Sequence, residues 1–382
     1  MNSQKNQILS NDRYQLILKL IYFLATVLFI YKSRLFLLEP RIWAEEGSVY
    51  LKDAILNGSK SLLNFHQGYY SIIPTFTFYV STFFNYKYIP YFALFASLSV
   101  WVLLFFIVAK LINPLFKIFL FISLFVLLNQ YQQLFLNTIN LQFITPLLLL
   151  IFLQNDLENI SKKKHIFLLV LIFLNIFNGV LGILLLPYLV YRLILVKKFK
   201  TLFFSLACVA LYALLYICFK EQSDNLSLSE RFVCNFNIKY QYWQKNQISL
   251  LKMHYYIILL VLSILFLLLK KWEISLISLI CFTNFCFIDM TKLCTLQITE
   301  RYRVYLYALT LIFFYGLIHK QLSTKLLLLP TLVISFFFSK SFFDTDHSYC
   351  IECPDWSSEY KNLEEKKKAK IHPAGWEIDI TK

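Results

Sequence analysis

The chain is built from apolar runs of about twenty residues, the length that an α-helix needs to cross the hydrocarbon core of a bilayer. Short segments rich in Lys and Arg separate these runs. Of the 382 residues, 58% are hydrophobic and only 15% are charged, whereas about a quarter of an ordinary soluble protein is charged. A soluble or disordered chain needs far more polar residues than this. The sequence therefore indicates an all-α, polytopic membrane protein.

The apolar runs predict eleven transmembrane helices, with juxtamembrane helices in the first outer loop. We interpret the first run as a signal anchor, because it is long, lacks a small-residue cleavage site and is followed by a charged Glu-Pro-Arg segment. The predicted crossings are 14–36, 89–109, 115–131, 136–153, 165–178, 180–196, 201–219, 254–270, 272–289, 303–319 and 325–341.

The fifth and sixth crossings are predicted to form a hairpin. They meet at Asn178-Gly179, a dipeptide that is typical of turns. Basic residues flank the two ends of the pair that lie away from this turn, so the tip of the hairpin is expected outside. One long kinked helix is the alternative.

The stretch 69–88 is apolar enough to cross a membrane, but the charge distribution argues against a crossing there. With the N-terminus inside, the inner segments hold 15 Lys and Arg against 4 Asp and Glu, whereas the outer segments hold 21 against 18. A further crossing would put either Lys162–Lys164 outside or the first loop inside, against the positive-inside rule. We therefore predict a re-entrant or interfacial helix pair, broken by Pro74, at the rim of an outward-facing site. The net charge of +15 thus reports topology and gives no support to a nucleic-acid partner.

Three polar regions face outside in this topology. The transmembrane domain, 1–341, includes the first outer loop at 37–88 and a large outer loop at 220–253. The tail, 342–382, contains an amphipathic stretch. It is too short for a large domain, and it is long enough to dock as a cap on the loops.

The eight cysteines divide equally between the membrane and the outer segments. Those in predicted helices are interpreted as small apolar fillers: Cys208, Cys218, Cys281 and Cys286. Those outside are Cys234, Cys294, Cys350 and Cys353. The last two form a CxxC motif, but no second pair or His cluster completes a zinc site. We predict a structural disulfide, with unpaired thiols as the alternative, and no metal site.

The densest polar cluster runs from Arg41 to Gly47, directly after the first crossing. Adjacent carboxylates at a membrane face are costly unless they are hydrated, paired or functional. Either Glu45 or Glu46 can serve as a general base that takes a proton from an acceptor hydroxyl. Desolvation or the neighbouring carboxylate would raise its pKa towards the working range. A solvated loop with an Arg41–Glu pair is the alternative, and Gly47 is expected to let the chain turn into an amphipathic helix.

Polar side chains also precede the second and fourth crossings. His66 is interpreted as a proton carrier or a hydrogen-bonding loop residue. Tyr69 and Tyr70 form either an aromatic belt or a platform for a sugar. The amides at the start of the fourth crossing line a cavity or bond between helices: Asn137, Asn140 and Gln142.

Basic residues at the outer end of the tenth crossing run against the positive-inside trend. Arg301 and Arg303 flank Tyr302, and Lys292 lies nearby. Because Arg binds phosphate through two parallel hydrogen bonds, we predict a clamp on the phosphate of a lipid carrier. Arg side chains that reach out to lipid headgroups are the alternative.

The motif RIWAEEG, followed by an amphipathic helix and HQGYYSIIP, resembles a bacterial family of multi-pass membrane proteins. In that family the first loop typically reads WAEDG and continues with a GY-to-IPR segment. Further similar segments follow in the family's order: NTINLQF, FNGVLGILLLP, ERYRVYL and IHPAGWEIDI. The chain departs from the pattern at Glu46, where Asp is usual, at Thr75, where Arg is usual, and at Asn178-Gly179, where Gly-Pro is usual.

The family in turn resembles GT-C-fold glycosyltransferases, which use polyprenyl-phosphate sugar donors. The resemblance implies a catalytic carboxylate at Glu46 or Glu45. It also implies a glycan, lipid or protein acceptor at the outer face of the bacterial inner membrane, with the N-terminus cytoplasmic and the C-terminus periplasmic. No cofactor is expected because nothing local indicates a metal, although paired carboxylates would also suit Mg²⁺ or Mn²⁺. The candidate substrate-binding residues are Arg41, His66, Tyr69, Asn140, Lys292, Arg301, Tyr302 and Arg303.

Two other classes of protein fit the same composition. A transporter or flippase of lipid-linked glycan would carry polar or charged residues in the middle of its helices, whereas the costly charges here gather at one surface. A non-catalytic membrane protein with the GT-C-like fold is the other alternative.

Overall fold

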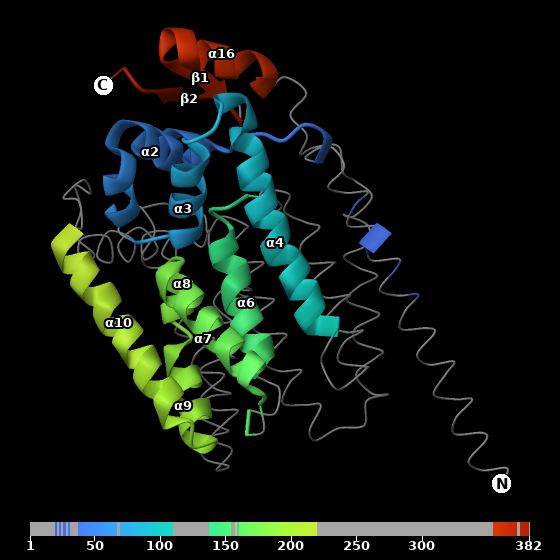
Figure 1. The fold of residues 1–382 in the computed structure, drawn as a ribbon, viewed down its shortest axis with the longest axis vertical. Coiled ribbons are helices and arrows are strands. Elements are labelled where there is room, and N and C mark those ends of the chain that lie inside the picture. The colour runs from blue at the N-terminus through green and yellow to red at the C-terminus, as the bar shows by residue number, and fades with distance from the viewer. Residues whose placement is uncertain are drawn as a thin grey trace, which may run out of the picture.

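The computed structural model describes residues 37–66, 69–109, 137–153, 157–158, 160–219, 354–372 and 375–381, together with isolated positions between 20 and 30. These residues are mostly helical (Figure 1). Apart from those isolated positions, six of the predicted crossings lie outside the described residues: 14–36, 115–131, 254–270, 272–289, 303–319 and 325–341.

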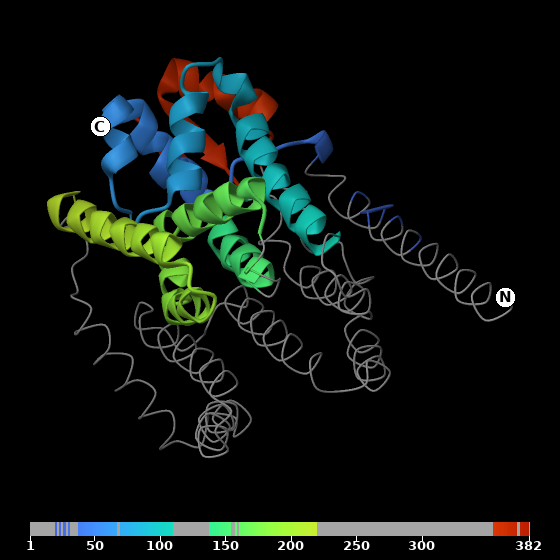
Figure 2. The same ribbon diagram turned by 60° about the horizontal axis from the view of Figure 1, so that its bottom comes forward.

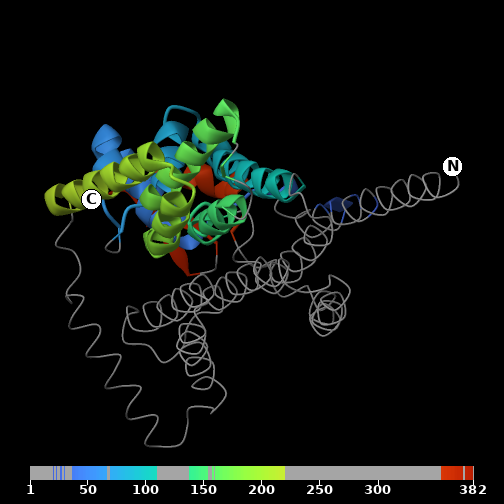
Figure 3. The same cartoon turned by 90° about the horizontal axis from the view of Figure 1, so that it is seen from below.

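Two of the described helices are long and apolar enough to cross a membrane. Helix α4, Ile89–Ala109, and helix α10, Phe199–Phe219, agree closely with the predicted crossings at 89–109 and 201–219. Both expose large apolar side chains: Phe95 on α4 is 73% exposed, and Phe203 on α10 is 76% exposed. Such side chains suit a lipid-facing helix, because lipid tails are as apolar as the side chains themselves. Figures 2 and 3 show α10 along the outer side of α7 and α9.

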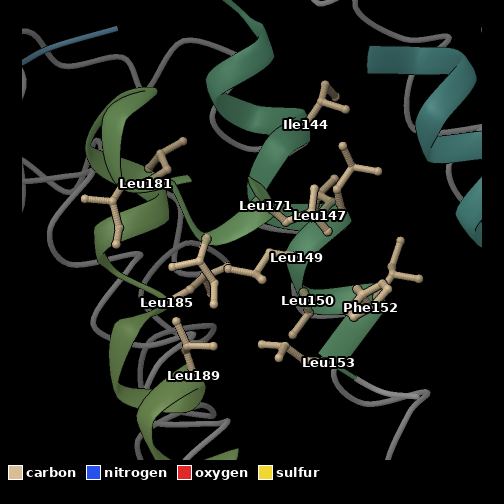
Figure 4. Close-up of a cluster of buried hydrophobic side chains, with 14 of the residues drawn as sticks. Ile144, Leu147, Leu149, Leu150, Phe152, Leu153, Leu171, Leu181, Leu185 and Leu189 are labelled. Carbon is tan, nitrogen blue, oxygen red and sulfur yellow. The ribbon is translucent and has the colours of Figure 1, made fainter. Parts of the chain in front are cut away.

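Helix α6, Leu141–Leu153, is buried along its whole length and forms the centre of the bundle. Helix α7, Lys162–Phe177, and the short helix α8, Val180–Ile183, pack against it. Leucines from these elements and from helix α9, Leu186–Leu195, form one apolar cluster (Figure 4). The predicted crossing at 136–153 is therefore shorter than expected, because its first residues form a turn.

The predicted turn at Asn178-Gly179 is confirmed, and the alternative of one long helix is wrong. The predicted crossing at 180–196 is not one helix, because a turn at 184–185 divides it into α8 and α9. Gly179 has φ = +92°, a conformation that L side chains rarely adopt. A Cβ at this position would lie 2.5 Å from Oε1 of Gln142 on α6. The turn therefore needs glycine for its backbone conformation and for its close approach to the central helix.

The stretch 69–88 contains one α-helix, which continues through Pro74, so the predicted helix pair broken by Pro74 is wrong. Helix α3, Ile72–Ser81, carries Pro74 in its first turn, where a backbone nitrogen has no partner inside the helix and proline is tolerated. Ten residues of α-helix are about 15 Å long, half the thickness of the hydrocarbon core. Helix α3 is therefore too short to cross, and the short 3-10 helix η3, Tyr86–Tyr88, leads from it into α4.

The first loop folds into three short helical segments before α3. They are the π-helical turn η1, Glu46–Leu51, the α-helix α2, Lys52–Asn57, and the 3-10 helix η2, Gly58–Leu63. Together with α3 they form a layer at one end of the bundle (Figure 1).

The tail corrects the all-α class, because it contains a two-stranded antiparallel sheet. Helix α16, Trp356–Lys366, is followed by strands β1, Lys368–Ile371, and β2, Trp376–Asp379. Lys367 takes a left-handed conformation that ends the helix. Side chains of β1 then alternate between exposed and buried, as a half-buried strand requires.

The tail caps the first-loop layer, as the sequence suggested. The backbone N–H of His372 donates to the carbonyl of Ile42 at 3.2 Å, and His372 pairs with Trp43 as a parallel bridge. The indole N–H of Trp356 donates to the carbonyl of Tyr86 at 3.0 Å. The C-terminal segment and the first loop therefore form one layer, the polar end of the bundle.

The opposite end of the bundle is basic. Lys198 Nζ donates to the carbonyl of Glu158 at 2.9 Å, and Arg192 Nη2 donates to the carbonyl of Leu153 at 3.1 Å. These contacts join the end of α6 and the segment before α7 to α9 and to the connection from α9 to α10. The basic residues of this end are Lys162, Lys163, Lys164, Arg192, Lys197, Lys198 and Lys200.

Candidate functional site

Glu46 is a buried carboxylate that joins the first loop to the central helix. It is 1% exposed. Its Oε1 accepts hydrogen bonds from the backbone N–H and the hydroxyl of Thr138, both at 2.6 Å, and its Oε2 accepts one from the backbone N–H of Trp43 at 3.0 Å. Burial raises the pKa of Glu46 to about 7, against the lowering effect of these hydrogen bonds. The sequence predicted this rise in pKa, because desolvation disfavours the charged form of a carboxylate.

Glu45 differs from Glu46 in its exposure. It is partly exposed, whereas Glu46 is inaccessible. The charge of Glu45 also contributes to the raised pKa of Glu46. Of the two carboxylates, Glu45 is the one that a solvent-borne hydroxyl can approach.

Arg41 pairs with Glu39, whose side chain is 61% exposed. Nη2 of Arg41 lies 3.2 Å from Oε2 of Glu39. Such a pair contributes little stability because one partner is hydrated.

Gly47 serves a different purpose from the predicted turn. It lies inside η1, and its φ is not positive. A Cβ on Gly47 would lie 2.6 Å from Cδ1 of Ile371 and 3.0 Å from side-chain atoms of Ile378. The glycine is thus needed for the close packing of the cap on the carboxylate motif.

Tyr50 connects the carboxylate motif to the second polar segment. Burial raises its pKa well above the usual range, and the nearby charges of Tyr69 and Glu45 act in the same direction. Oη of Tyr69 lies 3.4 Å from Nε2 of Gln142, which donates to it. The Tyr50 ring lies 4.9 Å from the His66 ring, and His66 pairs with Tyr69 through the backbone. Tyr50, His66, Tyr69 and Gln142 therefore belong to one region, which we call the first-loop wall.

Tyr70 has a structural role, and it is buried. Its hydroxyl donates to the carbonyl of Leu62 at 2.7 Å, and its own carbonyl accepts from the N–H of Gly179 at 2.8 Å. The hairpin tip therefore holds Tyr70 in place. Tyr69, partly exposed beside it, is the tyrosine that can meet a ligand.

The predicted amides at the start of α6 are all buried. Oδ1 of Asn137 accepts from the N–H of Ile139 at 2.9 Å, which shapes the turn that also presents Thr138 to Glu46. Asn140 is fully buried, and Gln142 reaches Tyr69. Two of these amides therefore support the turn and the wall.

Asp53 is a functional candidate that the sequence reasoning missed. Its Oδ1 accepts from Nδ2 of Asn57 at 2.5 Å, and Nδ2 of Asn64 lies 3.0 Å from both carboxylate oxygens. Nε2 of His66 lies 3.1 Å from Oδ2. Burial alone would raise the pKa of Asp53, but the contacts with His66, Asn57 and Asn64 hold it below its usual value. The i, i+4 spacing of Asp53 and Asn57 on a helix is the signal that could have found it.

His372 brings the cap to the edge of the site. Its ring lies 4.4 Å from the Trp43 ring, and its Nδ1 is buried without a hydrogen-bond partner in the described part of the chain. Burial and the nearby charge of Arg41 lower the pKa of His372 to about 4. It is therefore neutral at physiological pH.

Several predicted residues lie outside the described residues: Lys292, Arg301, Tyr302, Arg303, Cys234, Cys281, Cys286, Cys294, Cys350 and Cys353. Of the two described cysteines, Cys208 is a buried filler as predicted, whereas Cys218 is exposed. Within the described residues no group of three or more His, Cys, Asp or Glu side chains is arranged to hold a metal ion.

The chain matches no protein-family model, and no curated protein or solved structure is significantly similar to it.

Proposed function

We propose that the protein is a membrane glycosyltransferase that moves a sugar from a polyprenyl-phosphate donor to a hydroxyl of a glycan, lipid or protein. The observation that carries the proposal is the pair Glu45 and Glu46, one partly exposed and one buried, where apolar helices meet a polar layer. A carboxylate at such a boundary is within reach of a lipid-linked donor and of a water-borne acceptor.

In the proposed reaction Glu45 is the general base. The acceptor oxygen attacks the anomeric carbon of the sugar, and its proton passes to the Glu45 carboxylate. The bond between the anomeric carbon and the phosphate oxygen breaks, and its electron pair leaves with the phosphate. Arg301 and Arg303 remain the predicted groups that stabilise this phosphate.

Glu46 is a positioning residue in this proposal. Its bonds to Thr138 and Trp43 fix the backbone on both sides of Glu45. Tyr69, supported by Gln142, offers a ring face and a hydroxyl for a sugar.

The distribution of charge supports an outward-facing site. The basic end holds seven Lys and Arg residues, whereas the described first loop, 39–88, holds four acidic and four basic residues. By the positive-inside rule the basic end belongs in the cytoplasm. Because the tail packs on the first loop, both would lie on the periplasmic side of the inner membrane.

The described helices also favour surface chemistry over transport. Helices α4 and α6 contain no charged residue, and α10 carries one, Lys200, at its basic end. A path for a charged headgroup across the membrane needs polar residues at mid-depth.

The test compares variants in a strain that lacks the chromosomal gene. The first step is to find which sugar disappears from the envelope when the gene is deleted. Glu45→Gln should then restore that sugar at a rate at least about a hundredfold below wild type. Glu39→Gln, in the same loop, is the matched control and should restore it fully. Full restoration of the sugar by Glu45→Gln, Glu46→Gln and the double variant would refute a carboxylate mechanism. Variants that still move the lipid-linked glycan across the membrane, without transferring its sugar, would favour a flippase.

A further inference from the structure

The basic end concentrates positive charge that comes from separate parts of the chain. Residues 141–219 contain seven Lys and Arg against two acidic residues, Asp156 and Glu158. The basic residues lie in the first turns of α7 and α10, within α9, and between α9 and α10. Those with exposed side chains are Lys162, Lys163, Lys164, Lys197 and Lys200.

Two contacts hold the segments that carry these lysines against one another. Nε2 of His165, in the first turn of α7, lies 2.8 Å from Oγ1 of the buried Thr201, in the first turn of α10. Nζ of Lys198 donates to the carbonyl of Glu158, shortly before α7, at 2.9 Å. His165 directly follows three lysines, and Thr201 directly follows Lys200. The lysines of both helices therefore belong to one surface, at the lower ends of α9 and α10 in Figure 1.

The first turn of a helix is an unfavourable place for a lysine. The N-terminus of a helix carries a partial positive charge, which repels a cation. The first turns of α7 and α10 contain no acidic residue that would offset this repulsion. A negatively charged group beside these turns would offset it.

Lys197, between α9 and α10, carries its charge on a backbone that favours glycine. Its φ is +53°, in the left-handed region. The N–H of Lys197 donates to the carbonyl of Ile194 at 3.0 Å, and the N–H of Lys198 donates to the carbonyl of Leu193 at 2.9 Å. This pair of bonds ends a helix, and glycine is usual at the position that Lys197 occupies. A change of Lys197 to glycine therefore removes the charge without straining the fold.

Exposed apolar side chains border the lysines. Phe199 directly precedes Lys200, and Phe203 follows one turn later on α10; both are exposed. The other large apolar side chains that are exposed near this end are Ile166 and Val170 on α7 and Ile194 and Leu195 on α9. A phospholipid has the same order of parts, an anionic headgroup followed by apolar chains. Lysines beside apolar helix faces are complementary to such a molecule, whereas a soluble anion has no use for the apolar faces.

We propose that the basic end binds anionic phospholipids. Their phosphates contact the exposed lysines, and their acyl chains lie along the exposed faces of α9 and α10. Lysines and headgroups both stay hydrated in this arrangement, so it needs no buried pocket. The inference requires that α10 crosses the membrane, and it is independent of the proposed sugar transfer.

Binding of a fluorescent phosphatidylglycerol to the purified full-length protein in neutral detergent tests the proposal. The matched fluorescent phosphatidylcholine, which has no net charge, is the reference. Each lysine near an anionic headgroup contributes about fivefold in affinity, so wild type should bind the phosphatidylglycerol at least about twentyfold more tightly. Added salt should reduce this preference, because salt screens charges at a surface.

Two sets of changes locate the binding. Lys197→Gly should weaken phosphatidylglycerol binding by about fivefold and leave phosphatidylcholine binding unchanged. The combined changes Lys162→Gln, Lys163→Gln and Lys164→Gln should remove most of the preference. A full preference in this triple variant would contradict a site that includes the start of α7.

Lys367→Gly is the matched control for Lys197→Gly. Lys367 is also exposed and also left-handed, with φ = +60°, but it lies in the tail at the polar end. Both variants lose one charge and gain a residue that suits the backbone, so both should unfold at the wild-type temperature or above it. Only Lys197→Gly should weaken the binding of phosphatidylglycerol.

Three results would overturn the proposal. The first is equal affinity of the wild-type protein for the two lipids. The second is an equal loss of affinity in Lys197→Gly and Lys367→Gly, because the lipid would then respond to net charge alone. The third is displacement of the lipid by millimolar inorganic phosphate, which would identify the ligand as a soluble anion. The proposal predicts that phosphate leaves the lipid bound.

Discussion

The two ends of the described bundle differ in how they use polar side chains. At the polar end, two buried carboxylates have hydrogen-bond partners: Glu46 bonds to Thr138, and Asp53 bonds to Asn57 and Asn64. At the basic end, Lys162, Lys163 and Lys164 are exposed. A buried polar network costs desolvation unless its geometry is fixed, whereas exposed charges cost little. The polar end therefore has the properties of a site, and the basic end those of a solvated surface.

The largest stability effect should come from the hairpin tip, which supports the polar end. Gly179→Ala combines a positive φ with a collision against Gln142 and should destabilise the protein by about 4 kcal/mol. The matched control is Gly58→Ala, where φ is +55° and no atom lies within 4 Å of the added Cβ. It should cost about 2 kcal/mol. Unfolding of both variants in detergent measures the difference; equal losses would show that the tip is not packed against α6.

The next effect concerns the pH dependence of the buried carboxylate. The pKa of Glu46 is about 7 in the folded chain and 4.5 as a free group, so the folded chain binds the proton more tightly. The contribution of Glu46 to stability is therefore greatest below pH 4.5. It falls as the pH rises towards 7, by about 3 kcal/mol in all.

Glu46→Gln cannot ionise, so this part of the slope should vanish from its unfolding curves. The comparison is the difference in unfolding free energy between wild type and variant, measured from pH 4 to pH 8. A difference that stays constant across this range would show that Glu46 is hydrated.

A smaller effect is expected where the cap meets η3. Trp356→Phe keeps most of the buried ring and removes the hydrogen bond to the carbonyl of Tyr86, at a cost of about 1 kcal/mol. The tail should become more sensitive to limited proteolysis while the bundle stays intact. Unchanged cleavage of the tail would mean that this contact does not hold the cap.

The smallest effect should come from the basic end. Lys198→Met removes a charge and one exposed hydrogen bond to the carbonyl of Glu158. It should change stability by less than about 0.5 kcal/mol and leave sugar incorporation unchanged. A large loss of activity would show that the basic end also contributes to sugar transfer.

The sequence predicted the elements that depend on local patterns. Helices α4 and α10 are unbroken apolar runs, and Asn178-Gly179 is a local turn signal. The effect of Pro74 was misjudged because a proline is tolerated in the first turn of a helix and breaks one only further in. The two strands of the tail were not predicted, because four residues are too few to show a clear alternation of apolar and polar side chains.

The sequence identified the carboxylates of the candidate site but not the partners that each of them has in the fold. The motif identified Glu45 and Glu46 as a pair, but the partner of Glu46 is Thr138, 92 residues away in the chain. Asp53 was missed because Asn64 and His66 approach it only after η2 has folded. Contacts of this kind depend on tertiary packing, which a local pattern does not contain.

The central claim is that the polar end faces the outer compartment while the basic end faces the cytoplasm. Cysteine labelling tests it directly. Lys60→Cys and Lys163→Cys place a thiol at an exposed position of each end, and a membrane-impermeant maleimide is added to spheroplasts, with the unsubstituted protein as background. The account predicts labelling of Lys60→Cys in intact spheroplasts and of Lys163→Cys only after permeabilisation. The reverse pattern, or labelling of both in intact spheroplasts, would contradict it.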